Sequence, residues 1–191
     1  MEVGVLALQG AISEHIETLK NCGVKATLVK KPSDLMKIDG LIIPGGESTT
    51  IGKLILAFGF DKLIKKRAEE GMGIFGTCAG MILLGSEIED SPQQYTLKLM
   101  NIKVKRNAFG RQKESSELKI EVKGFGEVFN AIFIRAPIVT EVGSDVEILA
   151  QHPQRGSILV KEGKFLASSF HPELSSDRRI HKYFIEVIER R

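Results

Sequence analysis

Apolar runs and amphipathic segments alternate along the first half of the chain. Near-continuous apolar runs such as Val3–Leu8 and Leu41–Ile43 are typical of strands that are covered on both faces. Apolar side chains at helical spacing, such as Ile12, Ile16 and Leu19, predict a helix after the first strand. The predicted order is strand 3–8, a helix from 12 to a cap at Gly23, strand 25–29, a helical turn at 35–38, strand 41–43, a helical region over 48–70 interrupted near Gly59, and a strand that ends before Cys78.

The second half of the chain has a different pattern, in which short strands are separated by glycines and polar turns. Several of these strands alternate apolar and polar side chains, which is typical of hairpins with one wet face. They are expected at 102–104, 118–122, 128–134, 146–150, 158–160 and 165–170. Residues 179–191 then place Ile180, Phe184, Val187 and Ile188 on one helical face, which predicts a closing helix packed on the sheet.

Alternation of strands and helices predicts an α/β fold. Parallel strands need crossover helices, and hairpins in the second half add antiparallel strands. The 191 residues contain no linker-like or low-complexity stretch and no internal repeat. We therefore expect one three-layer domain over residues 1–191, with a mixed, mostly parallel sheet and helices on both faces.

Composition excludes several classes of protein. The content of 42% apolar and 27% charged residues is ordinary for a globular chain. No run approaches the roughly 20 apolar residues of a membrane span, and the first residues lack the basic segment of a signal peptide. The two cysteines, Cys22 and Cys78, do not make a disulfide framework. We therefore expect a cytoplasmic protein that does not bind a membrane.

Charge and motifs give no support for a nucleic-acid, metal or nucleotide site. The formal net charge of +3 is small, and the basic cluster at 62–67 is followed at once by Glu69 and Glu70. A solvated helix face explains this cluster better than a phosphate-binding surface. The chain has no CxxC pair, no HExxH and no P-loop, so we expect no cofactor, no metal and no nucleic-acid partner.

The turn Gly76–Gly80 carries the strongest chemical signal. Its sequence, Gly-Thr-Cys-Ala-Gly, lies between a predicted strand and an apolar run that can start a helix. A Gly-x-nucleophile-x-Gly turn in that context is a nucleophile elbow, with the sulfur of Cys78 in place of a serine oxygen. Taken alone, Cys78 could instead be an inert buried thiol, as most lone cysteines are.

A base and its orienting carboxylate are available in His171-Pro172-Glu173. Histidine suits proton transfer to and from a thiol near neutral pH. In an extended segment, residues two apart project the same way, which would place Glu173 beside His171. His171 could also be an ordinary structural histidine. His15 and His181 lie in helical patterns and His152 in a polar turn, so none is a strong competitor.

The turn at Gly45-Gly46-Glu47-Ser48 allows two interpretations. It could be a plain strand exit in which Ser48 caps the following helix. Alternatively, the Gly46 backbone could approach a substrate and direct an N–H at a developing oxyanion, with the Ala79 N–H as the second donor.

In their order and spacing, Pro44–Gly46, Gly76–Gly80 and His171–Glu173 resemble the class I, triad-type glutamine amidotransferases. Further segments make the chain similar to the glutaminase subunits of pyridoxal 5′-phosphate synthase, namely 8–10, 46–50, 106–112 and 133–137. The resemblance covers essentially the whole chain. It implies a flavodoxin-like α/β fold of the amidotransferase type.

The resemblance also implies an activity and a site. Cys78 would attack the side-chain amide of L-glutamine, His171 would move protons, and Glu173 would orient His171. The backbone N–H groups of Gly46 and Ala79 would form the oxyanion hole. Glutamine would be held by residues matching the family's binding segments, namely Gly46, Glu47, Ser48, Arg106, Ile134 and Arg135. A guanidinium such as that of Arg106 suits the substrate carboxylate, although solvated surface charge would also explain Arg106 and Arg135.

The implied partner is a synthase subunit, in an oligomeric core that this chain would decorate. It would take the ammonia through an internal channel and build the cofactor ring from a pentose phosphate and a triose phosphate. Family glutaminases of this type are typically switched on by docking, with the oxyanion hole set by contact with the partner.

Other functions remain open at this point. A glutaminase could serve another acceptor, such as histidine biosynthesis, although segment 106–112 argues against it. A catalytically silent interaction module should have lost Cys78, His171 or Glu173, which are all present. A cysteine peptidase on the same topology would leave the glutamine-binding segments unexplained.

Overall fold

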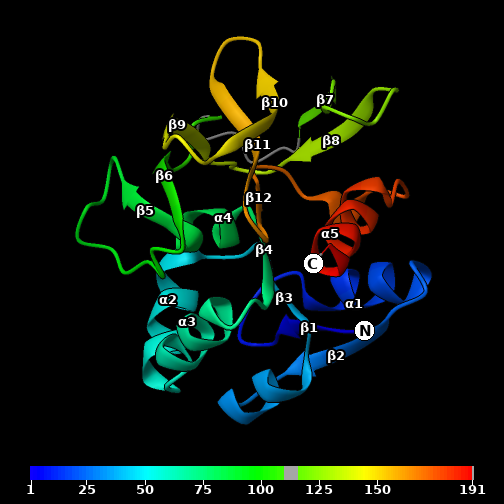
Figure 1. The fold of residues 1–191 in the computed structure, drawn as a ribbon. Helices are drawn as coiled ribbons and strands as arrows, with labels where there is room; N and C mark the ends of the chain where they lie inside the picture. The colour runs from blue at the N-terminus through cyan, green and yellow to red at the C-terminus, as the bar shows by residue number, and fades with distance from the viewer. Residues whose placement is uncertain (110–115, 191) are drawn as a thin grey trace.

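A mixed ten-stranded sheet runs through the computed structural model, which describes residues 1–109 and 116–190 (Figure 1). The elements in chain order are β1 (Glu2–Leu6), α1 (Ile12–Asn21), β2 (Lys25–Val29), the 3-10 helix η1 (Pro32–Lys37), β3 (Gly40–Ile43), α2 (Ser48–Ala57), α3 (Asp61–Glu69), β4 (Gly73–Thr77), α4 (Ala79–Leu84), β5 (Gly85–Ile88), β6 (Met100–Lys105), β7 (Ser116–Ile120), β8 (Phe129–Phe133), β9 (Ile138–Val142), β10 (Glu147–His152), β11 (Gly156–Glu162), β12 (Phe165–Ser168), the 3-10 helix η2 (Pro172–Leu174) and α5 (Arg179–Glu189).

Strand order separates the sheet into a parallel and a largely antiparallel part. The order is β2-β1-β3-β4-β12-β11-β9-β6-β5, with β10 paired to β11, while β7 and β8 form a separate hairpin. Strands β2, β1, β3, β4 and β12 are parallel to their neighbours, whereas β12, β11, β9 and β6 pair antiparallel in turn. The expected mixed α/β sheet is confirmed.

Alternation along the buried strands distributes apolar side chains between two cores. On β3, Leu41 and Ile43 pack in one cluster with side chains of α2, α3 and α4. Ile42, between them, points to the other face and packs in a cluster with Leu19 of α1 and Phe184 of α5. Helices therefore cover both faces of the parallel part, and Figure 1 shows α1 and α5 on the side away from α2 and α3.

Two strands were not expected from the sequence. Strand β5 follows α4 without a break, because the helix ends after six residues and its continuation pairs in parallel with β6. This pairing is a tertiary contact that an apolar run at 81–84 does not reveal. Strand β9, Ile-Val-Thr-Glu-Val, is rich in β-branched residues and lies between Pro137 and Gly143. The sequence therefore does contain a strand pattern at this place.

The adjacent parallel strands β4 and β12 bring distant parts of the chain to one edge of the sheet. Thr77 is in register with Ser168, and the Cys78 N–H donates to the Ser168 carbonyl at 2.8 Å. The segments that leave these two strands, Cys78 and 169–173, therefore emerge together at the carboxyl edge, where open α/β sheets bind ligands.

Among the residues that the structure describes, no helix combines the length and the apolar character that crossing a bilayer requires.

Candidate active site

Cys78 occupies a strained turn between β4 and α4. Its backbone angles, φ 49° and ψ −100°, are rare for a residue with a side chain and are typical of functional turns. A Cβ on Gly76 would collide with the backbone of Gly80, and one on Gly80 would collide with the carbonyl of Ile43. The small residues of the Gly-x-Cys-x-Gly turn are therefore required by packing.

His171 and Glu173 are in direct contact beside this turn. His171 Nδ1 lies 2.7 Å from Glu173 Oε1, and both side chains are buried. The His171 N–H donates to the carbonyl of Ile132 at 2.8 Å, which ties this segment to β8. The expected extended geometry is wrong, because Pro172 starts the 3-10 turn η2 and Glu173 reaches the imidazole from that turn.

The electrostatics favour a charged imidazole. Burial alone would lower the pKa of His171, but hydrogen bonds to the side chains of Cys78 and Glu173 outweigh burial and raise it to about 10. Since Nδ1 is taken by Glu173, Nε2 is the ring nitrogen available to Cys78.

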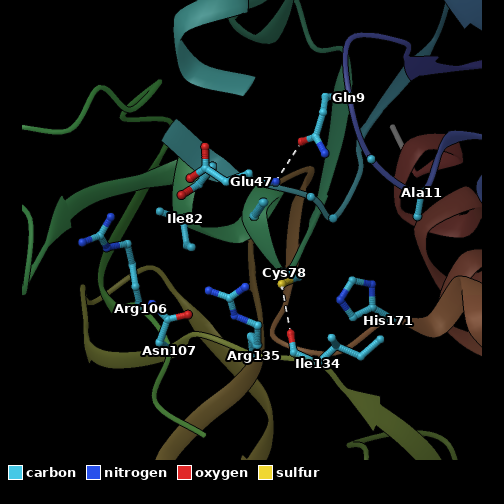
Figure 2. Close-up of a pocket in the computed structure, with 15 residues that line it drawn as sticks. Gln9, Ala11, Glu47, Cys78, Ile82, Arg106, Asn107, Ile134, Arg135 and His171 are labelled. Atoms are coloured by element: carbon cyan, nitrogen blue, oxygen red, sulfur yellow. Dashed lines mark hydrogen bonds between the residues drawn. The ribbon is translucent and has the colours of Figure 1, made fainter. Parts of the chain in front are cut away.

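The loop from Gly45 to Glu47 closes over the same point. A Cβ on Gly45 would collide with the imidazole of His171, so this position needs a glycine. Gln9 and Ala11 support the loop. Gln9 Oε1 accepts from the Glu47 N–H at 2.8 Å (Figure 2). The Ala11 N–H donates to the Gly45 carbonyl at 3.0 Å.

A cleft of about 460 Å³ joins these elements, and Figure 2 shows its lining. All the predicted site residues line it except Glu173, which lies behind His171. The complete lining is Gln9, Gly10, Ala11, Gly45, Gly46, Glu47, Ser48, Cys78, Ala79, Ile82, Arg106, Asn107, Ile134, Arg135 and His171. The predicted oxyanion donors, Gly46 and Ala79, therefore border the same space as Cys78.

Glu47, rather than Ser48, caps helix α2, so the plain-cap interpretation of Ser48 is wrong. The Glu47 carboxylate accepts from the backbone N–H groups of Thr49 at 3.0 Å and Thr50 at 2.7 Å. Partial burial opposes ionisation, but these bonds and that from the Thr50 hydroxyl lower the pKa of Glu47 to about 2. Glu47 therefore lines the cleft while its carboxylate is hydrogen-bonded to the first turn of α2.

Arg106 is held by two residues that the sequence analysis missed. Its Nε lies 3.2 Å from Asp90 Oδ2, and its Nη1 donates to Gln94 Oε1 at 2.8 Å. The Gln94 amide in turn donates to Ser48 Oγ at 2.9 Å. Gln94 thus links two predicted substrate residues, but a polar side chain between β5 and β6 carries no recognisable motif.

Ile134 and Arg135 follow β8 and reach the cleft from below in Figure 2. The Ile134 carbonyl lies 3.8 Å from Cys78 Sγ. Arg135 is exposed, has a positive φ of 47° and lines the cleft. Of the predicted segment 106–112, residues 110–112 lie outside the described residues.

Ile82 and Asn107 also line the cleft and were not predicted. His15 and His181 lie on helices as expected, but both are buried, and His15 lies close to Glu173 on one side and to His181 on the other. Within residues 1–109 and 116–190, no group of three or more His, Cys, Asp and Glu side chains is placed to hold a metal ion.

Comparison with known proteins identifies relatives along the full chain. Pyridoxal 5′-phosphate synthase subunit PdxT of Dehalococcoides mccartyi is 51% identical over 189 residues, covering 98% of this chain and 97% of the relative. The protein of the same name from Thermus thermophilus is 51% identical over 186 residues, covering 97% and 96%. A solved structure described as a glutamine amidotransferase is 50% identical, covers 98% of this chain and 99% of its own, and superposes with a TM-score of 0.93.

A family model described as the SNO glutamine amidotransferase family matches residues 5–190. With nearly the whole chain matched and full-length relatives at about half identity, this chain belongs to the SNO glutamine amidotransferase family.

Proposed function

We propose that the chain hydrolyses L-glutamine to L-glutamate and ammonia, and that the ammonia passes to the synthase subunit of a pyridoxal 5′-phosphate synthase. The activity agrees with the family and with relatives that carry the name of that synthase's subunit. One observation carries the chemistry: a buried Cys78–His171–Glu173 arrangement opens into a cleft lined by Gly46 and Ala79.

The first half of the proposed reaction forms a thioester. The Cys78 thiolate attacks the side-chain carbonyl carbon of glutamine, and the carbonyl oxygen takes up the negative charge. Gly46 and Ala79 would donate backbone N–H groups to this oxyanion. As the tetrahedral intermediate collapses, the C–N bond breaks and His171 Nε2–H gives its proton to the departing nitrogen, which leaves as ammonia.

The second half regenerates the thiolate. His171, now neutral, accepts a proton from water as the water oxygen attacks the thioester carbonyl. Collapse breaks the C–S bond, releases glutamate and returns the imidazolium–thiolate pair. Glu173 keeps the Nδ1 proton of His171 in place throughout, so that Nε2 alone exchanges protons with sulfur, ammonia and water.

Substrate recognition is proposed for the other wall of the cleft. Arg106 and Arg135 offer guanidinium groups that can pair with the α-carboxylate of glutamine. The backbone of Glu47, the backbone and hydroxyl group of Ser48, and the backbone of Ile134 complete the binding residues. This division leaves Cys78, His171 and Glu173 for the reaction.

The ammonia is proposed to pass to the synthase subunit without entering bulk water. Ammonia released to water at neutral pH is mostly protonated and no longer nucleophilic, so an enclosed transfer to an oligomeric synthase core is proposed. Residues 1–191 would act as a single amidotransferase domain. A cytoplasmic location is consistent with Cys22 and Cys78, neither of which forms a disulfide.

Glutamate release from glutamine tests this function. The purified chain is assayed alone and with the synthase subunit, beside Cys78→Ala and Cys22→Ala. Cys78→Ala should lose about 10⁴-fold or more of the activity, whereas Cys22→Ala should retain it. Activity that does not respond to the synthase would reassign the pathway, and full activity in Cys78→Ala would overturn the proposed nucleophile.

A further inference from the structure

A second group of buried polar side chains lies directly behind the proposed triad. It consists of His15 on α1, Thr77 at the end of β4 and His181 on α5, each 0% exposed. His15 Nδ1 lies 2.9 Å from His181 Nε2, and His15 Nε2 lies 3.2 Å from Thr77 Oγ1. None of the three lines the cleft, so substrate binding does not explain them.

The contact between this group and the triad is at Glu173. Its Oε1 is taken by His171, while its Oε2 is buried and accepts no hydrogen bond from any residue that the structure describes. His15 Nε2 lies 3.5 Å from this free oxygen. A buried carboxylate oxygen is costly without a donor, so an N–H at His15 Nε2 would be stabilising.

Both histidines are neutral near pH 7, so each carries one ring proton. Burial, followed by the nearby His181 and His171, lowers the pKa of His15 well below its usual value. Burial also lowers the pKa of His181 to about 4. The contact between His15 and Glu173 is therefore a dipole against a carboxylate rather than an ion pair.

Only one arrangement of the two protons satisfies the neighbours. With a proton on His15 Nδ1, the Nε2 lone pair would face a carboxylate, and His181 Nδ1 would be a buried N–H without a partner. With both protons on Nε2, His181 donates to His15 Nδ1, and His15 directs its N–H at Thr77 and Glu173. The atom left without a partner, His181 Nδ1, then carries only a lone pair.

We propose that His15 is a positioning residue that holds the free carboxylate oxygen of Glu173 through its Nε2–H, and that His181 sets the tautomer of His15. The inference rests on the proposed function, because it concerns how Glu173 orients the imidazole of His171. Two neutral rings can hold Glu173 without adding a positive charge that would oppose the imidazolium. The titratable groups facing His171 are Cys78, Glu173 and His15, and those facing His15 are Glu173, His171 and His181.

Two substitutions of His15 separate positioning from simple packing. His15→Leu fills similar space without a donor, whereas His15→Gln can place an amide N–H near the position of Nε2. In the complex with the synthase subunit, His15→Leu should lower kcat about ten- to hundred-fold while KM changes less than about two-fold. His15→Gln should restore most of kcat, and Thr18→Val, a buried change on the same helix, should match the unmodified chain.

The pH profile adds a readout that lost packing would not move. With Glu173 less well held, the imidazolium of His171 should lose its proton at a lower pH, so the basic limb of kcat shifts down in His15→Leu and not in Thr18→Val. A less firmly held imidazolium also stabilises negative charge on the Cys78 sulfur less, so alkylation of Cys78 by iodoacetamide at neutral pH, followed by mass spectrometry of its peptide, should slow.

Nitrogen NMR of the unmodified chain shows directly which ring nitrogens of His15 and His181 carry protons. It therefore tests the proposed arrangement even if His15→Leu does not fold. Protons on Nε2 of both His15 and His181 are expected, and a proton on His15 Nδ1 would overturn the inference. Unchanged kcat, pH profile and alkylation in a folded His15→Leu would also overturn it. So would equal losses in the Leu and Gln variants.

Alkylation and tautomers need no glutamine, so they separate this inference from the proposed function. Absence of glutaminase activity in the unmodified complex, with the expected tautomers and slowed alkylation, would remove the function and leave the positioning role.

Discussion

The two walls of the cleft are built in contrasting ways. One wall is formed by Cys78 and His171, with Glu173 behind His171. These residues are only 7%, 7% and 6% exposed, so water has little access to them, and this side is called the dry wall. Each is tied to the sheet through β4 or the segment after β12, and His171 contacts the side chains of both Cys78 and Glu173. Such burial strengthens electrostatic interactions and keeps the reacting groups in one geometry.

The opposite wall, called the wet wall, carries Arg106, Arg135 and Glu47; it is more accessible to water and consists largely of loops. The Arg106 side chain is 26% exposed, its partner Asp90 is 36% exposed, and Glu47 and Arg135 are exposed as well. Two of its charged groups already have protein partners, because Arg106 contacts Asp90 and Gln94, and Glu47 accepts hydrogen bonds from Thr49 and Thr50. A substrate carboxylate must therefore join or displace existing contacts there, whereas the triad wall needs no rearrangement of its own bonds.

This comparison predicts that changes in the dry wall act on kcat and changes in the wet wall act on KM. Glu173→Gln gives the largest expected effect. The amide keeps the size of the side chain but removes the charge that helps to raise the pKa of His171. We expect kcat to fall about 10²- to 10⁴-fold with little change in KM.

The pH dependence of Glu173→Gln follows from the same charge. In the unmodified chain the imidazolium persists at neutral pH and is lost as the pH rises through about 10. Without the Glu173 charge it is lost at lower pH, so the basic limb of the kcat profile moves down. An unchanged profile in steady-state assays of the complex would show that Glu173 does not act on His171.

Arg106→Ala is the matching test of the wet wall. Loss of the guanidinium should raise KM about ten- to hundred-fold and leave kcat within a few-fold, because a charge-assisted bond to the ground-state substrate is removed. Lys105→Ala is the control, since its half-exposed side chain pairs with Glu89 and does not line the cleft. A fall in kcat alone would contradict the assignment of Arg106 to binding.

Gln94→Ala should give a smaller change in the same direction. Gln94 does not line the cleft, but it donates to Ser48 and accepts from Arg106. Its loss frees both residues, and we expect KM to rise about two- to ten-fold. The neighbouring exposed residue provides a control, so Gln93→Ala should be indistinguishable from the unmodified chain in the same assay.

The smallest expected effect is on stability. Glu47→Ala removes the cap of α2 and should lower the free energy of unfolding by about 0.5–2 kcal/mol at neutral pH, measured by urea denaturation. Since the folded-state pKa of Glu47 is depressed to about 2 from 4.5, its contribution is present above pH 4.5 and is lost as the pH falls towards 2. The difference between the two chains should therefore shrink over this range.

Glu69→Gln, an exposed change on α3, serves as the control for the cap. A Glu47→Ala difference that stays constant down to pH 2 would show that the cap does not depend on the carboxylate charge.

Local sequence was sufficient for most of the parallel half. Strand β2 and the break between α2 and α3 lie where the pattern placed them, and the α/β class followed from the alternation of elements. The elbow at Cys78 was also readable, since Gly76 and Gly80 are needed within a few residues of the thiol. These features depend on backbone preferences and packing over one or two turns of chain.

Tertiary structure alone decided which side chains meet. The pairing of β4 with β12 brings Cys78 to His171, and the route of the chain between β5 and β6 brings Asp90 and Gln94 to Arg106. Likewise, only the packing of α1 and α5 on one face of the sheet joins His15 to His181. Local patterns report helix, strand and turn, because these depend on near neighbours. They carry no information on strand register or on contacts across the core, which bring together residues far apart in the chain.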